Sequence, residues 1–89
     1  MPHVVFAPAL QRHLSLPERE VLGDTVASAL HSLMQEQPRL RSYLLDDQGQ
    51  LRRHVQIFVD GLAVRDRQRL SDPLGDSSEV FVVQALTGG

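Results

Sequence analysis

The last two residues of the chain are the ones whose type and position most clearly suggest chemistry. Gly88 and Gly89 follow a β-rich stretch with no intervening linker. Glycine has no side chain, so such an end can thread a narrow active-site channel in another protein. The carboxylate of Gly89 is unhindered and could attack the α-phosphate of ATP, giving an acyl-adenylate open to a sulfur or amine nucleophile. Taken alone, the same two glycines could equally be an inert flexible end or an expression artefact.

The other polar residues give little support for catalysis within the chain. Its histidines, at His3, His13, His31 and His54, lack close metal-ligand spacing, so we expect no metal site. Asp46-Asp47, Asp72 and Asp76 lie in turn-forming contexts, and no histidine is placed to activate Ser71, Ser77 or Ser78. No cysteine is present, which excludes a thiol nucleophile and a disulfide. No glycine cluster with a lysine offers a phosphate site, so no cofactor is expected on the chain itself.

Length and composition narrow the class of protein. The 89 residues have room for one domain, predicted to span residues 1–89, and no room for an enclosed substrate cavity beside the core. The net charge of −2 does not indicate nucleic-acid binding. No apolar run could span a membrane and no secretory signal is recognised, so we expect a cytoplasmic protein. All nine basic residues are arginine, most simply through codon bias.

Apolar periodicity predicts the elements that must position the C-terminus. Strands are expected at His3–Ala7 and Arg19–Leu22, joined by a loop from Pro8 to Pro17. Asp24 is the expected N-cap of the main helix, which ends near Gln37 because Pro38 follows. The remaining elements are a helical turn at 39–45, a strand at 51–59, an Asp60-Gly61 hairpin turn, a short return strand at 62–64, a turn at 71–75 and a last strand at 79–86. Residues 86–89 are expected to form a flexible tail.

This order predicts an α+β fold with a mixed sheet of four to five strands and one main helix. The first and last strands should pair in parallel at the centre. The period of two directs Val55, Ile57 and Val59 toward the helix, with Val80 and Val82. Phe58, Phe81 and Val83 then point to the opposite face, which one helix cannot cover. An open apolar patch of this kind commonly marks an interaction site.

Element order and tail together resemble the ubiquitin-like β-grasp proteins, and within them the bacterial sulfur carriers of the MoaD/ThiS type. The resemblance covers essentially the whole chain. It rests on three segments, Gly23-Asp24-Thr25-Val26, residues 53–61 (RHVQIFVDG) and residues 84–89 (QALTGG). Residues 39–49 and the strand beginning at His54 look closest to the CysO-like branch, which serves cysteine synthesis. The sequence departs from the family pattern in the first hairpin turn, at Ser77-Ser78 before the last strand, and at Gln84, where a proline is common.

The resemblance implies a mechanism in which the chain is a co-substrate and not an enzyme. A ubiquitin-activating-type adenylating enzyme would use ATP and Mg²⁺ to activate Gly89, and a sulfur source would convert it to a thiocarboxylate. Thr87 and Gly88 would thread the active-site channel. Phe58, Phe81, Val83 and Leu86 would dock the partner, as the matching apolar patch of ubiquitin does. A sulfur-accepting synthase, and in some branches a metalloprotease, would be further partners.

Two alternatives stay open on the sequence. The chain could be a ubiquitin-like modifier joined through Gly89 to target lysines, because the same tail serves both purposes. It could also be a non-covalent interaction domain whose tail is inert. The acceptor of the sulfur is equally open among cysteine, homocysteine, molybdopterin, thiazole and thio-metabolite synthesis.

Overall fold

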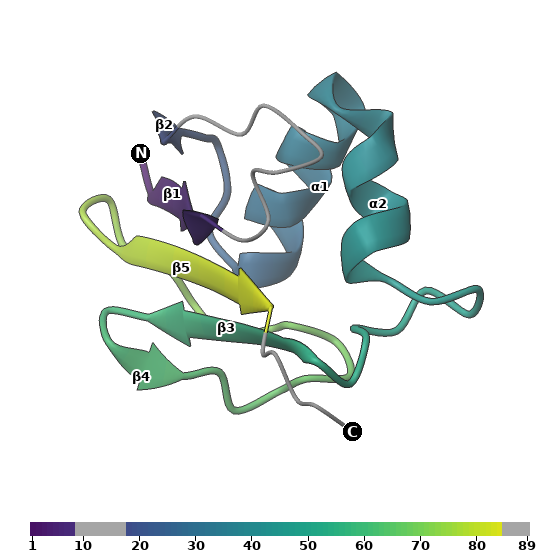
Figure 1. Cartoon of the computed structure of the whole chain (residues 1–89). Helices are drawn as coiled ribbons and strands as arrows, with labels where there is room; N and C mark the ends of the chain where they lie inside the picture. Colours follow the sequence, from purple (N-terminus) through teal and green to yellow (C-terminus); the bar gives the residue numbers. More distant parts are fainter. Residues whose placement is uncertain (9–17, 85–89) are drawn as a thin grey trace.

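One mixed sheet with two helices on one of its faces makes up the part of the chain that the structure describes, residues 1–8 and 18–84 of a computed structural model (Figure 1). Five strands lie in the order β2-β1-β5-β3-β4. The elements, in chain order, are β1 (His3–Phe6), β2 (Arg19–Glu20), α1 (Val26–Glu36), α2 (Pro38–Leu44), β3 (Val55–Val59), β4 (Leu62–Ala63) and β5 (Glu79–Gln84).

The two strands nearest the ends of the chain form the centre of the sheet. β1 pairs with β5 in parallel, with Val4 opposite Val80 and Phe6 opposite Val82. β5 pairs with β3 on its other side, antiparallel. The predicted α+β class, the mixed sheet and the central parallel pair are therefore confirmed. The chain therefore leaves the sheet at the end of its middle strand, β5.

Alternation along the strands separates a buried face from a more open one. Val55, Ile57, Val80 and Val82 are completely buried and belong to one hydrophobic core with both helices. From α1 that core receives Val26, Ala29, Leu30 and Leu33, at the spacing that the sequence predicts. Both helices lie behind the same face of the sheet (Figure 1).

The start of α1 differs from the prediction by one residue. Thr25, and not Asp24, is the N-cap: its Oγ1 accepts the backbone N–H of Ser28 at 3.1 Å, and the Oγ of Ser28 accepts the N–H of Thr25 at 3.1 Å. Thr25 is the residue whose extended backbone directly precedes the first helical turn, so its side chain reaches the unpaired N–H. Gly23 packs against the helix so closely that a Cβ atom there would lie 2.6 Å from the backbone nitrogen of Ala29.

A second helix stands where the sequence predicts only a helical turn. α2 begins at Pro38, which suits the first position of a helix because its missing N–H would be unpaired there anyway. Its Leu40 and Leu44 are completely buried at a spacing of four residues. Packing of these two leucines against the core makes α2 a true helix, so the prediction of one helix was incomplete.

Several strands are shorter than predicted. The strand expected at 51–59 begins only at Val55, because the backbone before it is engaged elsewhere: Arg52 N–H donates to the carbonyl of Leu44, and Arg52 C=O accepts from Val55. The predicted Asp60-Gly61 turn is confirmed, with φ of 51° and 85° at the two positions, as a type I′ hairpin requires. The predicted loop residues 9–17 and the end of the last strand, Ala85 and Leu86, lie outside the described residues.

Candidate functional site

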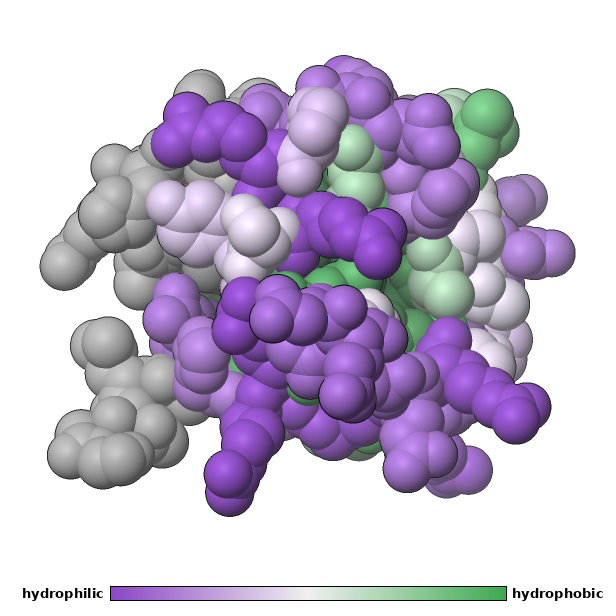
Figure 2. Space-filling model, turned by 90° about the vertical axis from the view of Figure 1, so that its right-hand side faces the viewer, coloured by the Kyte–Doolittle hydropathy of each residue, from purple (hydrophilic) through white to green (hydrophobic). Residues whose placement is uncertain are grey.

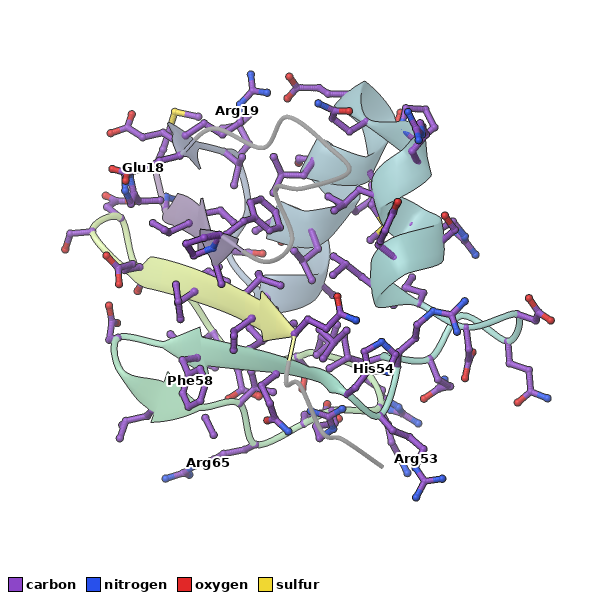
Figure 3. All side chains as sticks on the ribbon, in the orientation of Figure 1. Glu18, Arg19, Arg53, His54, Phe58 and Arg65 are labelled. Atoms are coloured by element: carbon purple, nitrogen blue, oxygen red, sulfur yellow. The ribbon has the colours of Figure 1, made fainter. Side chains whose placement is uncertain are left out.

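The open face of the sheet brings the predicted docking residues together. Phe58 of β3 lies directly opposite Phe81 of β5, and Val5 of β1 flanks Phe81 on its other side. All three side chains are half-buried. Of their sequence neighbours on the covered face, Val59 is partly buried against the core and the others are buried. Figure 3 labels Phe58 on its strand. In the part of the chain that the structure describes, both helices pack on the other face of the sheet.

Val83 extends the row toward the end of β5. It lies opposite Gln56 and is half-buried as well. Three of the four predicted docking residues, Phe58, Phe81 and Val83, therefore share one surface. The fourth, Leu86, lies outside the described residues, as do the predicted threading residues Thr87 and Gly88 and the predicted reactive residue Gly89.

The end of β5 lies at a corner of the sheet, beside the start of β3, and side-chain hydrogen bonds stabilise this corner. Gln84, the last residue of β5, pairs with Val55 at the start of β3. The guanidinium of Arg67 donates to the carbonyl oxygen of Val55 at 2.9 Å and to that of Arg52 at 3.0 Å, and it contacts Gln56 Oε1 at 3.4 Å. Because a guanidinium is permanently charged and planar, these bonds hold the loop of Arg67 rigidly against the start of β3.

The same corner carries two arginines and a histidine. Arg53 is exposed and His54 is half-buried, and Figure 3 shows both beside the start of β3. The Nε of Arg52 donates to the carbonyl of Ser42 at 3.0 Å. Arg52 is thus engaged within the chain, and Arg53 is the more exposed of the two neighbouring arginines.

The remaining polar candidates do not gather into a reactive site. Asp46 Oδ1 accepts the backbone N–H of Gln48 at 2.9 Å and of Gln50 at 3.0 Å, as a turn-forming aspartate does. His3 contacts Glu18 at 2.6 Å. Within residues 1–8 and 18–84, no group of three or more histidine, aspartate or glutamate residues could hold a metal ion. In the same residues, no helix has the length and apolar character needed to cross a membrane.

One carboxylate has a shifted pKa and a structural role. Asp66 Oδ2 accepts the hydroxyl of Ser71 at 2.5 Å, and Asp66 Oδ1 accepts the backbone N–H of Arg69 at 2.9 Å. These bonds, that of Ser71 foremost, lower the pKa of Asp66 below 3.8. The predicted turn former Asp72 adds to the same loop by accepting the N–H groups of Arg65 and Asp66. Together these hydrogen bonds show that both aspartates stabilise the loop of residues 65–72.

Sequence reasoning missed two contributors to the candidate site. Val5 belongs to the apolar row, and the alternation of β1 could have indicated it once the parallel register was known. Arg67 could not have been found in this way, because its contacts to residues 52–56 join positions 11 to 15 apart through a long side chain.

Solved structures with the same fold cover nearly the whole chain. CysO from Amycolatopsis orientalis, in its complex with BexX, has a TM-score of 0.83 and 20% identity and covers 100% of both chains. CysO from Mycobacterium tuberculosis has a TM-score of 0.81 and 24% identity over 97% of this chain and 100% of that chain. The small archaeal modifier protein 1 of Methanosarcina acetivorans has a TM-score of 0.80 and 24% identity over 99% and 95%. The fold is accordingly the ubiquitin-like β-grasp.

The sequence itself decides the family. No curated protein matches the chain significantly. The sequence model of the ThiS family matches residues 8–89, which include β5, the apolar row of β3 and β5, and the C-terminal glycines. This chain belongs to the ThiS family.

Proposed function

We propose that this chain is a sulfur carrier protein that transports sulfur as a thiocarboxylate on Gly89. The observation that carries the proposal is the Gly88-Gly89 end, four residues beyond the central strand β5, in a chain of the ThiS family. The carrier is a protein co-substrate, and the catalysis belongs to its partners. Because the activation consumes ATP, we place the protein in the cytoplasm.

The proposed chemistry has two steps. The Gly89 carboxylate attacks the α-phosphate of ATP in the presence of Mg²⁺, forming a glycyl-adenylate and releasing pyrophosphate. A sulfide ion then attacks the acyl carbon, AMP leaves with the electrons of the C–O bond, and the thiocarboxylate remains on Gly89. Both ATP and Mg²⁺ are bound by the adenylating enzyme. The carrier contributes an unhindered carboxylate and no side chain that competes for the activated carbon, since it has neither cysteine nor lysine.

The open sheet face is the proposed docking surface for that enzyme. Phe58 and Phe81 pair across the two strands, and Val83 continues their row toward the end of β5. A partner bound there would hold the start of the tail, so that Leu86 extends the contact and Thr87 and Gly88 enter the active-site channel. Arg53, exposed at the corner beside Gln84, is available to an acidic group of the same partner.

A second enzyme would take the sulfur from the carrier. We propose a synthase that accepts sulfur for a biosynthetic product, with a metalloprotease as an additional partner if a product is released from the carrier by cleavage. The likeness to CysO, solved in complex with BexX in Amycolatopsis orientalis, supports a partner enzyme of the sulfur-transfer type.

The test is a reconstitution followed by intact-mass measurement. The full chain is incubated with an adenylating enzyme from the same genome, ATP, Mg²⁺ and sulfide. The proposal predicts that one oxygen of the chain is replaced by one sulfur, and that omission of ATP prevents the exchange. A chain lacking Gly89 should keep its circular dichroism spectrum and gain no sulfur. Unchanged mass across every candidate adenylating enzyme of the genome would contradict the proposal.

A protein-modifier function is the second candidate. The likeness to small archaeal modifier proteins favours it, because these have the same fold over nearly the full length of both chains. The activated Gly89 would then be attacked by a target lysine amine, which forms an amide. The leaving group is AMP, or a cysteine thiol of a conjugating enzyme if Gly89 has first formed a thioester with it. Recovery of Gly-Gly remnants on cellular lysines, dependent on this chain, would favour this function.

A non-covalent interaction domain is the third reading left by the sequence. It would use the open sheet face and leave the tail unmodified. A variant ending in Ala-Ala that kept full activity in cells would favour this reading over both covalent functions.

A further inference from the structure

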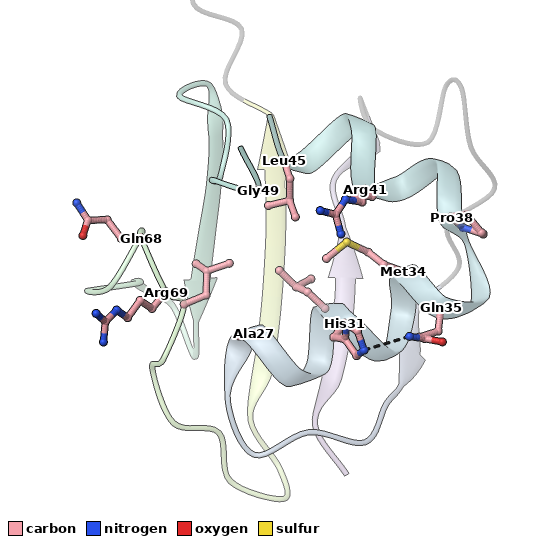
Figure 4. Close-up of a pocket in the computed structure, with 12 residues that line it drawn as sticks. Ala27, His31, Met34, Gln35, Pro38, Arg41, Leu45, Gly49, Gln68 and Arg69 are labelled. Atoms are coloured by element: carbon pink, nitrogen blue, oxygen red, sulfur yellow. Dashed lines mark hydrogen bonds between the residues drawn. The ribbon is translucent and has the colours of Figure 1, made fainter. Parts of the chain in front are cut away.

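Arg67 is engaged differently from the long polar side chains around it. Hydrophilic side chains cover most of the side of the molecule that carries α2, as expected for residues that face water (Figure 2). In the loop after β4, Gln68 and Arg69 likewise point outward, away from both helices (Figure 4). Arg67 is half-buried instead, and the two terminal nitrogens of its guanidinium donate to backbone carbonyls of β3 and of the residues before it. Arg67 thus links two segments of the chain.

The guanidinium of Arg67 completes the outer edge of β3 beyond the point where β4 ends. β4 pairs with only the last two residues of β3. Just after β4, the N–H of Val64 donates to the carbonyl of Ile57 at 2.9 Å. Backbone groups alternate in direction along a strand, so the carbonyl of Val55 points to the same edge as that of Ile57. Nη1 of Arg67 donates to this carbonyl at 2.9 Å and takes the place of the missing strand partner.

The two residues of β3 that Arg67 contacts are the ones that pair with the end of β5. Val55 lies opposite Gln84, the last residue of β5, and Gly89 follows five positions later in the sequence. The alternation turns the backbone groups of Gln56 toward β5, on the side away from Arg67. The side-chain Oε1 of Gln56 is contacted by Nη1 of Arg67 at 3.4 Å. Arg67 therefore holds β3 from outside at the place where β5 pairs with it from inside.

The loop that carries Arg67 is itself attached to the core. The carbonyl oxygens of Leu70 and Asp72 accept the N–H groups of Ala27 and Val26, at 2.8 and 3.1 Å. These N–H groups belong to the first turn of α1, where no partner exists within the helix. The loop and the start of α1 therefore stabilise each other, and Arg67 extends to β3 from a fixed position.

We propose that Arg67 is a positioning residue for the reaction at Gly89. It acts through Val55 and Gln56, keeping the end of β5 paired and fixing the point from which residues 85–89 leave the sheet. The inference rests on the proposed function, because it matters only if a partner enzyme receives the C-terminus. The ends of strands open locally unless they are held. Each further residue that a partner must order lowers the association constant by about tenfold, so a fixed end of β5 favours binding.

Steady-state kinetics of the full chain with its adenylating enzyme test the inference. Pyrophosphate release is followed at saturating ATP while the concentration of the carrier is varied. In Arg67→Gln, the KM for the carrier should rise about tenfold, because one further residue must be ordered, and kcat should stay nearly unchanged. Arg67→Lys keeps the charge without the planar fork and should recover part of the loss. Arg65→Gln, exposed in the same loop, is the matched control and should keep the KM of the unchanged chain.

A second variant separates positioning from a general loss of stability. Ala29→Gly weakens α1, because glycine is unfavourable inside a helix, and it leaves the corner at the end of β5 intact. Its free energy of unfolding should fall while its KM stays unchanged. Amide hydrogen exchange gives the structural counterpart: Gln56 and Val83, which face each other across β3 and β5, should exchange faster in Arg67→Gln, whereas the amides of α1 should not.

The outcomes distinguish this inference from the proposed function. If the unchanged chain is activated and Arg67→Gln has the same KM, or loses kcat alone, the inference is overturned and the sulfur chemistry stands. An equal rise of KM in Ala29→Gly or in Arg65→Gln would also overturn it, because the effect would then not be specific to the bonds of Arg67. If no adenylating enzyme of the genome activates the unchanged chain, the proposed function is contradicted, and the inference with it.

Discussion

The two faces of the central sheet carry similar residues and use them differently. On the covered face, Ile57, Val80 and Val82 are 0% exposed and pack against both helices. On the open face, Phe58, Phe81 and Val83 lie at neighbouring positions of the same strands and stay half-buried. The two sets alternate along β3 and β5, so one pair of strands supplies both the core and the candidate docking surface.

The difference shows how an 89-residue protein can keep a surface for recognition without weakening its core. Burying an aliphatic side chain fully contributes about 1.5 to 3 kcal/mol, which a small domain needs for its stability. Side chains of the open face contribute less to folding, because water still reaches part of each one. A substitution on the covered face should therefore act on stability, and a substitution on the open face should act on partner binding.

Ile57→Ala is expected to have the largest effect on stability. Removal of a completely buried side chain loses its transfer free energy and leaves a cavity, together about 2 to 5 kcal/mol. Chemical denaturation monitored by circular dichroism measures the loss. A loss below about 1 kcal/mol would mean that the covered face is not the main source of stability.

Gly23→Ala tests the same side of the molecule at its tightest backbone contact. The added Cβ would lie 2.6 Å from the nitrogen and 2.8 Å from the Cα of Ala29, so α1 must shift. We expect a loss of about 1 to 3 kcal/mol, as for overpacking of a core. Gly75→Ala is the matched control, because the nearest atom to its added Cβ would be Ser78 Oγ at 3.7 Å, an ordinary van der Waals distance. Equal stabilities of the two variants would show that the contact at Gly23 relaxes freely.

The double variant Phe58→Thr and Phe81→Thr tests the open face. Threonine keeps a β-branched side chain in both strands, so only the half-buried area of the two rings is lost, which should lower the free energy of unfolding by about 1.5 to 3 kcal/mol in total. The rate of activation by the adenylating enzyme, as kcat/KM, should fall at least about tenfold, as for central residues of an interface. Unchanged kcat/KM in a folded double variant would place the docking surface elsewhere.

Asp66→Asn should have the smallest effect on stability against unfolding. The effect should be present at neutral pH and should disappear in acid. Since the pKa of Asp66 is lowered on folding, its carboxylate contributes stability that is complete well above 3.8 and is lost as the pH falls through its folded pKa. The loop it organises ends at Leu70, which belongs to the core on the covered face. The unchanged chain should therefore be the more stable at neutral pH, and the difference should shrink in acid. Denaturation curves at several pH values measure this, and a difference independent of pH would contradict it.

The alternating strands were predictable from sequence because their pattern is local. Adjacent residues fix the register of this hairpin, because the strand Val55–Val59 runs directly into the Asp60-Gly61 turn. It follows that Phe58 and Ile57 lie on opposite faces of the sheet. The class of the fold and the shared sheet face of Phe58, Phe81 and Val83 could thus be inferred before the structure was known.

Features that depend on distant contacts could not be inferred in the same way. α2 forms because Leu40 and Leu44 are buried by elements from elsewhere in the chain, which raises a predicted turn to a helix. Whether Asp24 or Thr25 caps α1 depends on where the extended backbone ends, and both residue types are good caps. Arg67 supports the corner beside Gln84 through bonds to residues 52–56, which no local pattern encodes.

Fragment masses of the reconstituted protein show whether Gly89 is the residue that receives the sulfur. After reaction with the adenylating enzyme, ATP, Mg²⁺ and sulfide, digestion at arginine releases a C-terminal peptide that begins at Leu70. We expect this peptide to carry one sulfur in place of one oxygen, and we expect fragmentation to locate the sulfur on Gly89. A chain lacking Gly89 should show neither change. A C-terminal peptide of unchanged mass, or sulfur found at any other residue, would contradict the proposal.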